Sequence, residues 1–334
     1  MHVLVADAHL LPHRSRLEAA LPAGVTVCWR EPGDSRILDD LPEADVYVGS
    51  RFTADMAAVA HRLRLIHVNG AGTDKIDFAH LRADTLVANT FHHEQSIAEY
   101  IAGAAVLLRR DFLAQDRALR TGRWATPGYD RQIPQPRTLR DARIGYIGFG
   151  HIGRTSWKLL RAFGADAVAV TGTGRVDAAA EGLRWAGDTG RLTALMTESD
   201  VVVVCAPLTE RTVGMIGADE LRALGPSGVL INVGRGPLVV ESALYEALSA
   251  GTIAAAALDV WYRYPGPDGD GTPGDLPFDT LPNVLMTPHV SGVTADTFTA
   301  RADDIAANIG RVQRGEPLVN QIDRMDRQSG HQLS

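Results

Sequence analysis

The chain has only two cysteines, Cys28 and Cys205, and no apolar run approaches the ~20 residues of a membrane-spanning helix. Two cysteines cannot build a disulfide framework, and they fit a reducing compartment. An excess of positive charge is also absent: the formal charge is −7, which argues against nucleic acid or an anionic membrane as partner. The N-terminus lacks the basic segment and apolar core of a signal peptide. We therefore expect a soluble cytoplasmic protein.

The 334 residues leave room for about two domains, and both halves alternate short β-branched runs with helical segments. This alternation predicts an α/β fold with two Rossmann-like, doubly wound parallel sheets. The strands expected in the first half are Val3–Ala6, Val25–Trp29, Val46–Gly49, Leu65–Val68 and Thr85–Ala88. Those expected in the second half are Arg143–Gly148, Ala167–Val170, Val201–Cys205, Val229–Val233, Ala255–Val260 and Val284–Met286.

Two long helices are also predicted. Ser96–Arg120 is expected to form one helix, with Ser96 and Glu99 as a capping box. Gly122–Pro136 is rich in Pro, Gly and Arg and is predicted to be a loop. The last helix, Thr294–Arg314, follows the second sheet, and we expect it to return to the first domain.

The most specific motif is Gly148-Phe149-Gly150-His151-Ile152-Gly153, between an apolar run and the helical stretch Arg154–Phe163. In a dinucleotide-binding turn, the first glycine makes a tight turn and the second lets backbone approach a pyrophosphate. The third lets helix and strand pack closely. The free N–H groups at the helix start would then hold the pyrophosphate.

Two polar side chains follow later strands of the same predicted sheet. Arg235 lies in Asn232-Val233-Gly234-Arg235-Gly236, and His289 lies in Thr287-Pro288-His289. Ligands of open α/β sheets bind beyond the carboxyl ends of the strands. A guanidinium there can grip a carboxylate, and an imidazole can exchange the proton that accompanies hydride transfer. Each residue alone fits a solvated loop equally well, but their shared sheet edge favours a functional role.

These motifs, in this order, resemble the D-2-hydroxyacid dehydrogenase family with its formate and phosphite dehydrogenase relatives, over nearly the whole chain. The stretch 69–77 resembles the loop whose backbone amides hold the substrate's acid group, which implies Ala71 and Gly72 as substrate-binding residues. Arg235 matches the substrate-binding arginine and His289 the catalytic acid/base. Asp259 matches the aspartate near the nicotinamide.

The resemblance also implies the domain organisation and the cofactor contacts. It implies a discontinuous substrate domain, 1–97 and 293–334, and an inserted dinucleotide-binding domain, 98–292. The region from Ser96 resembles the family's dimerisation region, which implies a homodimer. No metal site is expected. The implied cofactor-binding residues are Gly148, Gly150, His151, Ile152, Gly153, Thr171, Arg175, Cys205, Pro207, Thr212, Val233, Gly234, Asp259, Ser291 and Gly292.

Tyr264 departs from the family pattern, because the histidine's usual acid partner lies at this position, five residues after Asp259. A tyrosine hydroxyl can orient the imidazole of His289 but carries no negative charge at neutral pH. We therefore expect carbonyl reduction to decline at lower pH than in relatives with glutamate. Formate dehydrogenases also lack an acid here. The asparagine that they use beside the substrate has no clear match, and His92 or His93 falls nearby as either a substrate contact or a solvated hinge residue.

The predicted end of the second cofactor-domain strand carries Thr171-Gly172-Thr173-Gly174-Arg175, where NAD enzymes place Asp or Glu. The absence of a carboxylate and the presence of Arg175 favour NADP over NAD, although Arg175 could equally contact nothing in a loose loop. Asp177 would reverse the preference if the loop folds back. Cys205 stands where the family often has histidine or asparagine, and we expect an inert packing residue.

The favoured function is an NAD(P)-dependent oxidoreductase that transfers a hydride between nicotinamide and a small 2-hydroxy or 2-keto acid, as glyoxylate and hydroxypyruvate reductases do. A formate- or phosphite-type dehydrogenase that needs little acid/base help is the second hypothesis. The third is a catalytically weakened, cofactor-binding regulatory protein, which only Tyr264 supports.

Overall fold

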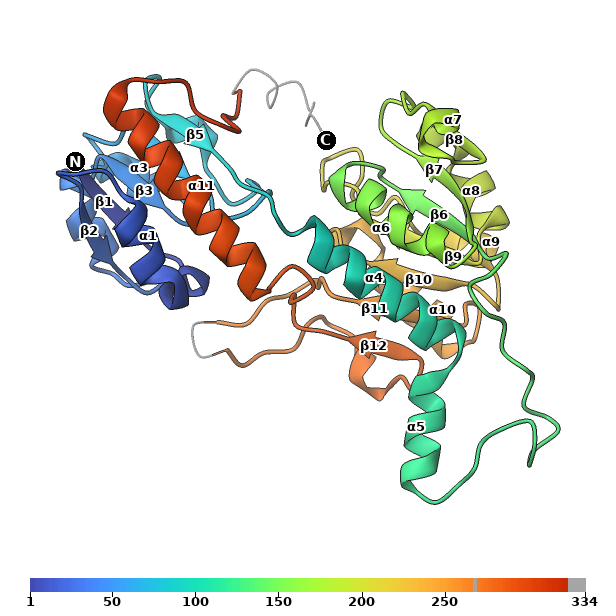
Figure 1. Ribbon diagram of the computed structural model, residues 1–334. Helices are drawn as coiled ribbons and strands as arrows, with labels where there is room; N and C mark the ends of the chain where they lie inside the picture. The colour runs from blue at the N-terminus through green and yellow to red at the C-terminus, as the bar shows by residue number, and fades with distance from the viewer. Residues whose placement is uncertain (267–268, 324–334) are drawn as a thin grey trace. The chain divides into compact units, whose positions relative to one another are not determined.

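The computed structural model describes residues 1–266 and 269–323, which divide into two compact units. The first contains Met1–His92 and the segment that starts at Val293, and the second contains His93–Gly292. Each unit is built on one parallel sheet (Figure 1). The predicted boundary after residue 97 lies inside helix α4 (Glu94–Arg109). The second unit begins at His93, directly before this helix.

In the first unit, the described strands form a parallel sheet in the order β2-β1-β3-β4-β5. All the strands predicted for this half are confirmed. Their bounds are β1 (His2–Val5), β2 (Thr26–Trp29), β3 (Val46–Val48), β4 (Leu65–His67) and β5 (Leu86–Ala88).

Helices cover both faces of this smaller sheet. Helices α1 (Arg14–Ala20) and α11 (Ala295–Arg314) pack on one face, and α2 (Ile37–Asp40) and α3 (Ala54–Val59) on the other. The hydroxyl of Thr294 accepts the N–H of Thr297 and so caps α11. The last helix therefore completes the first domain, as expected.

In the second unit, the described strands form a larger parallel sheet in the order β12-β11-β10-β9-β6-β7-β8. The order reverses at β6, which is the doubly wound arrangement predicted from the sequence. The bounds are β6 (Arg143–Ile147), β7 (Asp166–Val170), β8 (Trp185–Gly187), β9 (Val201–Val204), β10 (Val229–Asn232), β11 (Ala255–Leu258) and β12 (Val284–Met286). Strand β8 was not predicted, because Trp-Ala-Gly contains no β-branched residue and the strand pairs with β7 alone at the sheet edge.

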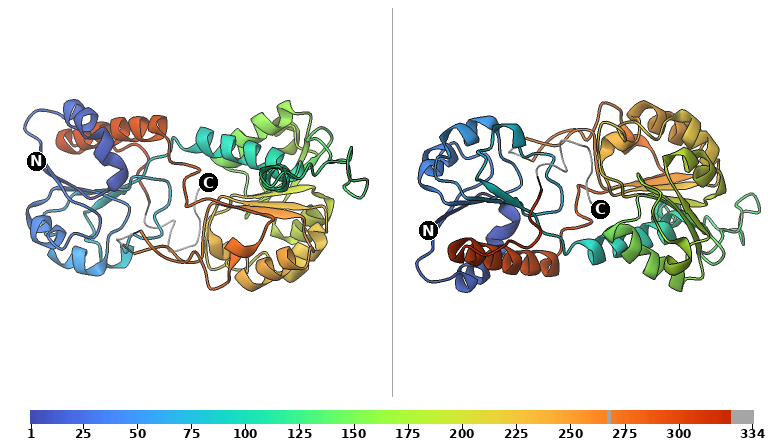
Figure 2. Two further views of the ribbon diagram at one scale, coloured as in Figure 1. Left: turned by 90° about the horizontal axis from the view of Figure 1, so that it is seen from below. Right: turned by 90° about the horizontal axis from the view of Figure 1, so that it is seen from above.

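Figure 2 shows helices on both faces of the larger sheet. Helices α4 and α6 pack on one face, and α8, α9 and α10 on the other. All residues of β9 are buried, as expected for a strand covered on both faces. The remaining helices of this unit are α5 (Phe112–Arg120), α6 (His151–Ala162), α7 (Ala178–Glu181), α8 (Leu192–Glu198), α9 (Ala218–Leu224) and α10 (Glu241–Ser249).

The helix predicted over 96–120 is in fact two helices, α4 and α5. Asp111 between them has φ 52°, a left-handed conformation that ends a right-handed helix. The predicted capping box is also wrong. The N-cap is His93, and the Ser96 hydroxyl donates to the His93 carbonyl (3.0 Å), while Glu99 accepts from Gln95 (2.9 Å). Helical periodicity continues through Asp111, so it does not mark the break.

Short 3-10 helices complete the described secondary structure, and within the described ranges no helix has the length and apolar character to cross a membrane. The 3-10 helices are η1 (Ala8–His13), η2 (Leu41–Glu43), η3 (Phe78–His80), η4 (Thr189–Arg191), η5 (Gly236–Leu238) and η6 (Phe278–Thr280).

Candidate active site

The glycine turn joins β6 to α6 at the carboxyl edge of the larger sheet. Gly148 has φ 89°, and a Cβ there would lie 2.7 Å from the backbone nitrogen of Ala206. A Cβ on Gly153 would lie 3.1 Å from the Gly148 carbonyl oxygen. Glycine is therefore required at position 148 and favoured at position 153, and α6 starts close against the end of β9. Gly150 is the N-cap and has no side chain to cap the helix start at His151 and Ile152, so this helix start fits a pyrophosphate.

Cys205 lies behind the glycine turn. Its Sγ donates to the carbonyl oxygen of Gly148 (3.1 Å), and burial raises the pKa of the thiol to about 12. The thiol is therefore protonated at neutral pH, which agrees with the expected packing role. Further along, the Thr212 hydroxyl accepts from the Thr209 N–H and donates to the Pro207 carbonyl (both 2.8 Å), so Thr212 shapes the predicted cofactor loop.

The turn after β7 is held by its own threonine. The Thr171 hydroxyl accepts the N–H of Gly174 (3.0 Å), whose φ is 66°. Arg175 follows it, is exposed and makes no ion pair with a described residue. Asp177, which would reverse the cofactor preference, caps α7 by accepting from the Ala180 N–H (3.1 Å).

Arg235 follows β10 on a backbone that is fixed on both sides. The buried Asn232 accepts from the Gly234 N–H and donates to the Arg235 carbonyl (both 3.1 Å). The half-buried guanidinium donates to the Gly234 carbonyl (2.9 Å), and Val233 is buried. A Cβ on Gly236 would lie 2.5 Å from the backbone carbonyl carbon of Trp261, so this turn also packs against the chain after β11.

His289 follows β12 with φ 58°, a conformation that is uncommon outside glycine. The fully buried carboxylate of Asp259 supports this turn. It accepts from the N–H groups of Val290 (2.9 Å) and Ser291 (3.0 Å) and from the hydroxyls of Thr287 (2.7 Å) and Ser291. Both carboxylate oxygens are thus engaged by the His289 turn. This supporting role was not anticipated from the sequence, which suggested a nicotinamide contact for Asp259.

We expect Asp259→Asn to lower the free energy of unfolding by about 2–4 kcal/mol, because an amide N–H₂ would face donors and leave them unsatisfied in the core. The shift in the denaturant midpoint measures this effect. Asp279→Asn makes the same chemical change at an exposed position and should leave the midpoint nearly unchanged. Equal midpoints for the two variants would contradict the supporting role.

Tyr264 lies beside His289, at the position that the family gives to an acid. The ring centroids are 5.6 Å apart and the rings are tilted by 51°. The Tyr264 hydroxyl accepts the N–H of Trp261 (3.3 Å), and the Trp261 indole N–H donates to the Thr287 carbonyl (2.8 Å). The imidazole therefore has an aromatic neighbour that brings no formal charge.

In the first unit, the loop with Ala71 and Gly72 follows β4. Its carbonyl groups are bound to the body of the unit: Asn89 donates to Ala71 (2.8 Å), and Arg301 of α11 donates to Asn69 (3.2 Å). These contacts fix the loop. Neither Asn89 nor Arg301 was predicted from the sequence. The signal for Arg301 is an arginine on the buried side of an amphipathic helix.

The two histidines of the crossover have different surroundings. His92 has φ 68°, and its Nε2 lies 2.7 Å from Asp304 of α11, whereas His93 is the N-cap of α4. The Thr297 hydroxyl also donates to the His92 carbonyl (3.1 Å). His92 is thus tied to α11, which favours the hinge interpretation for this residue.

Comparison with known proteins agrees with the geometry. Residues 102–291 match the model of the D-isomer specific 2-hydroxyacid dehydrogenase, NAD binding domain. Glycerate dehydrogenase of Methylorubrum extorquens is 31% identical over 261 residues, which are 76% of this chain and 77% of that protein. D-3-phosphoglycerate dehydrogenase of Methanocaldococcus jannaschii is 31% identical over 292 residues, 86% of this chain, and the chain spans about half (53%) of that relative.

Among solved structures, the NADPH-dependent glyoxylate/hydroxypyruvate reductase of Sinorhizobium meliloti in complex with citrate is 28% identical. It superposes with a TM-score of 0.77 over 96% of each chain. The two parallel sheets and the glycine turn at the start of α6 agree with the family match. This oxidoreductase belongs to the D-isomer specific 2-hydroxyacid dehydrogenase family.

Proposed function

We propose that the protein is an NADP-dependent reductase of small 2-keto acids, similar to glyoxylate and hydroxypyruvate reductases. The observation that supports this best is the placement of Arg235 after β10 and His289 after β12, on either side of β11, which Asp259 directly follows. Because these strands are parallel, all three residues lie at one edge of the sheet. When bound, the nicotinamide cofactor supplies or accepts the hydride.

In this proposal Arg235 binds the acid group of the substrate. Its planar guanidinium can offer two parallel N–H donors to a carboxylate, and its charge polarises the neighbouring carbonyl. His289 donates a proton to the carbonyl oxygen during reduction and takes one from the hydroxyl in the reverse direction. We further propose, from the family resemblance, that the N–H groups of Ala71 and Gly72 and the side chain of His93 bind substrate.

The surroundings of Arg175 support the choice of NADP. Asp177 uses one carboxylate oxygen to cap α7, and Asp188 uses one to accept the Gly190 N–H (3.0 Å). The exposed guanidinium of Arg175 makes no ion pair with a described residue and can pair with a 2′-phosphate.

We expect Arg175→Ala to raise the KM for NADPH roughly 10–100-fold, because one charge-assisted phosphate contact is lost, and to leave the KM for NADH unchanged. Steady-state kinetics with both cofactors measure this difference. Lys158→Ala, which removes an exposed charge from α6, is the matched control and should change neither value. A wild-type preference for NADH, or equal effects on both cofactors, would contradict the NADP assignment.

One assay panel tests the function as a whole. Wild-type protein is mixed with NADPH or NADH and glyoxylate, hydroxypyruvate or pyruvate, and with the oxidised cofactors and formate or phosphite. We expect reduction of a keto acid with NADPH. Turnover of formate or phosphite alone would instead establish the second candidate, which the uncharged Tyr264 beside His289 favours, since formate oxidation releases no hydroxyl proton. Tight cofactor binding without turnover of any compound would indicate a regulatory protein.

We also propose that the protein is a homodimer that associates through α5 and the segment after it. Helix α5 has no fully buried residue, and the large apolar side chains of Leu119, Trp124 and Tyr129 are exposed there. Exposed aromatic residues are typical of protein interfaces. Sedimentation of the intact chain at the mass of a monomer would exclude this.

A further inference from the structure

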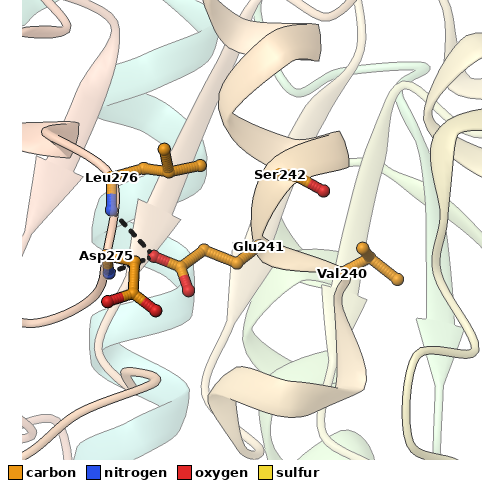
Figure 3. Close-up of a pocket in the computed structure, with 5 residues that line it drawn as sticks. All are labelled: Val240, Glu241, Ser242, Asp275 and Leu276. Carbon is orange, nitrogen blue, oxygen red and sulfur yellow. Dashed lines mark hydrogen bonds between the residues drawn. The ribbon is translucent and has the colours of Figure 1, made fainter.

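Glu241 begins α10 and lines a surface pocket of about 370 Å³, together with Val240, Ser242, Asp275 and Leu276. Figure 3 shows its carboxylate extending from the helix towards the chain at 275–276. One carboxylate oxygen accepts the backbone N–H groups of both Asp275 (2.6 Å) and Leu276 (3.0 Å). Glu241 therefore ties α10 to a segment that lies more than thirty residues later in the sequence.

This segment is the returning end of the chain that leaves the sheet after β11, whose described residues, 262–266 and 269–276, we call the 262–276 loop. The two ends of the loop are bonded to each other: the N–H groups of Tyr262 (3.1 Å) and Arg263 (2.9 Å) both donate to the Pro273 carbonyl. Arg263 also forms an ion pair with Asp275. The outgoing end of the loop is thus placed by the returning end, which Glu241 holds.

The base of the loop is tightly packed. A Cβ on the buried Gly274 would lie 3.1 Å from the carboxyl carbon of Glu241 and 3.5 Å from the ring of Tyr262. The Tyr262 ring in turn stacks on Phe278, with centroids 6.3 Å apart. Glu241, Gly274 and Tyr262 therefore lie close together at the base of the loop.

The outgoing end of the loop carries Tyr264, one residue beyond the Arg263 N–H that bonds to Pro273. The Tyr264 ring lies against the imidazole of His289, and its hydroxyl accepts the Trp261 N–H. Glu241 is thus connected to the proposed acid/base residue: it binds the returning end of the loop, that end binds the outgoing end, and the outgoing end places Tyr264 against His289.

We propose that Glu241 is a positioning residue: by holding the returning end of the 262–276 loop, it keeps Tyr264 against His289. This inference rests on the proposed function only in that His289 is the group that exchanges the proton. What Glu241 contributes is acceptor capacity and not charge, because a single oxygen receives both N–H groups.

The test measures the nuclear magnetic resonance signals of the His289 ring protons, whose chemical shifts are changed by the ring current of Tyr264. These signals are assigned by their absence from the spectrum of the His289→Asn variant. Glu241→Ala is expected to move these signals in the same direction as Tyr264→Ala does. Glu241→Gln keeps an acceptor oxygen and should retain the wild-type signals. Glu246→Ala removes an exposed carboxylate from the same helix and is the matched control. In a Tyr264→Ala background, Glu241→Ala should add no further change.

The inference is overturned if Glu241→Ala leaves the His289 signals at their wild-type positions, or moves them equally with and without Tyr264. Should Glu241→Ala fail to fold, Gly274→Ala crowds the same contact and must move the signals instead. A kinetic arm follows if wild-type protein reduces keto acids: kcat should fall roughly 10–100-fold in Glu241→Ala, with NADPH affinity unchanged. Absence of keto-acid turnover in the wild type would refute the proposed function, while the resonance experiment would still decide the role of Glu241.

Discussion

Replacing Arg235 with glutamine is expected to lower kcat/KM for a 2-keto acid roughly 10²–10⁴-fold, equivalent to about 3–5 kcal/mol, as for removal of one partner from a desolvated charge pair. Glutamine retains length and a donor but loses the charge and the two parallel N–H groups. The backbone around Arg235 should keep its shape, because Asn232 bonds to both Gly234 and Arg235 without using the guanidinium.

Arg235→Lys separates charge from geometry. Lysine keeps the positive charge but cannot grip a carboxylate with two parallel donors, so we expect an intermediate loss, mainly as an increase in KM for the keto acid. The dissociation constant for NADPH and the thermal midpoint should stay close to their wild-type values in both variants. Full activity of Arg235→Gln, or an equal loss of NADPH binding, would remove Arg235 from the proposed acid-binding role.

Replacing His289 with asparagine is expected to lower kcat for keto-acid reduction roughly 10²–10⁴-fold, because the reaction loses its proton donor. Asparagine is suited to this position, since it tolerates the left-handed conformation that His289 adopts at φ 58°. The loss of rate can then be attributed to the imidazole and not to a collapsed turn. Steady-state rates of wild type and variant, compared under the same conditions, measure the effect.

Two further variants make this result interpretable. His289→Ala should be less stable than His289→Asn, because alanine is strained at positive φ. His61→Asn makes the same side-chain change at an exposed position of the first unit and should leave kcat unchanged. A His289→Asn variant that reduces keto acids at the wild-type rate would exclude His289 as the proton donor and would leave the formate-type candidate as the better explanation.

Much of the fold was predictable because its signals are local. The β-branched runs that became β1 and β9 and the glycine motif that became the β6–α6 turn are each contained in a few consecutive residues. Edge strand β8 and the helix break at Asp111 were not predictable in this way. Neither one changes the apolar pattern of its segment, and the left-handed conformation of the single residue Asp111 leaves no mark on helical periodicity.

The same difference between local and long-range information applies to the candidate site. The residues that bear the chemistry, Arg235 and His289, were identified by their order after predicted strands. Asp259 was identified as a cofactor contact and not as the support of the His289 turn. Arg301 behind the Ala71 loop and Glu241 at the base of the 262–276 loop were not identified at all.

The amino-acid sequence by itself determined the alternating α/β pattern, the dinucleotide-binding turn and the family, because periodicity and short motifs are properties of neighbouring residues. Only the tertiary structure decided which side chains, distant in sequence, contact and hydrogen-bond one another. Asp259 reaches residues 290 and 291, and Tyr264 reaches His289, across adjacent strands. Such contacts depend on the folded path of the chain, because the pairing of β11 with β12 brings Asp259 beside the His289 turn.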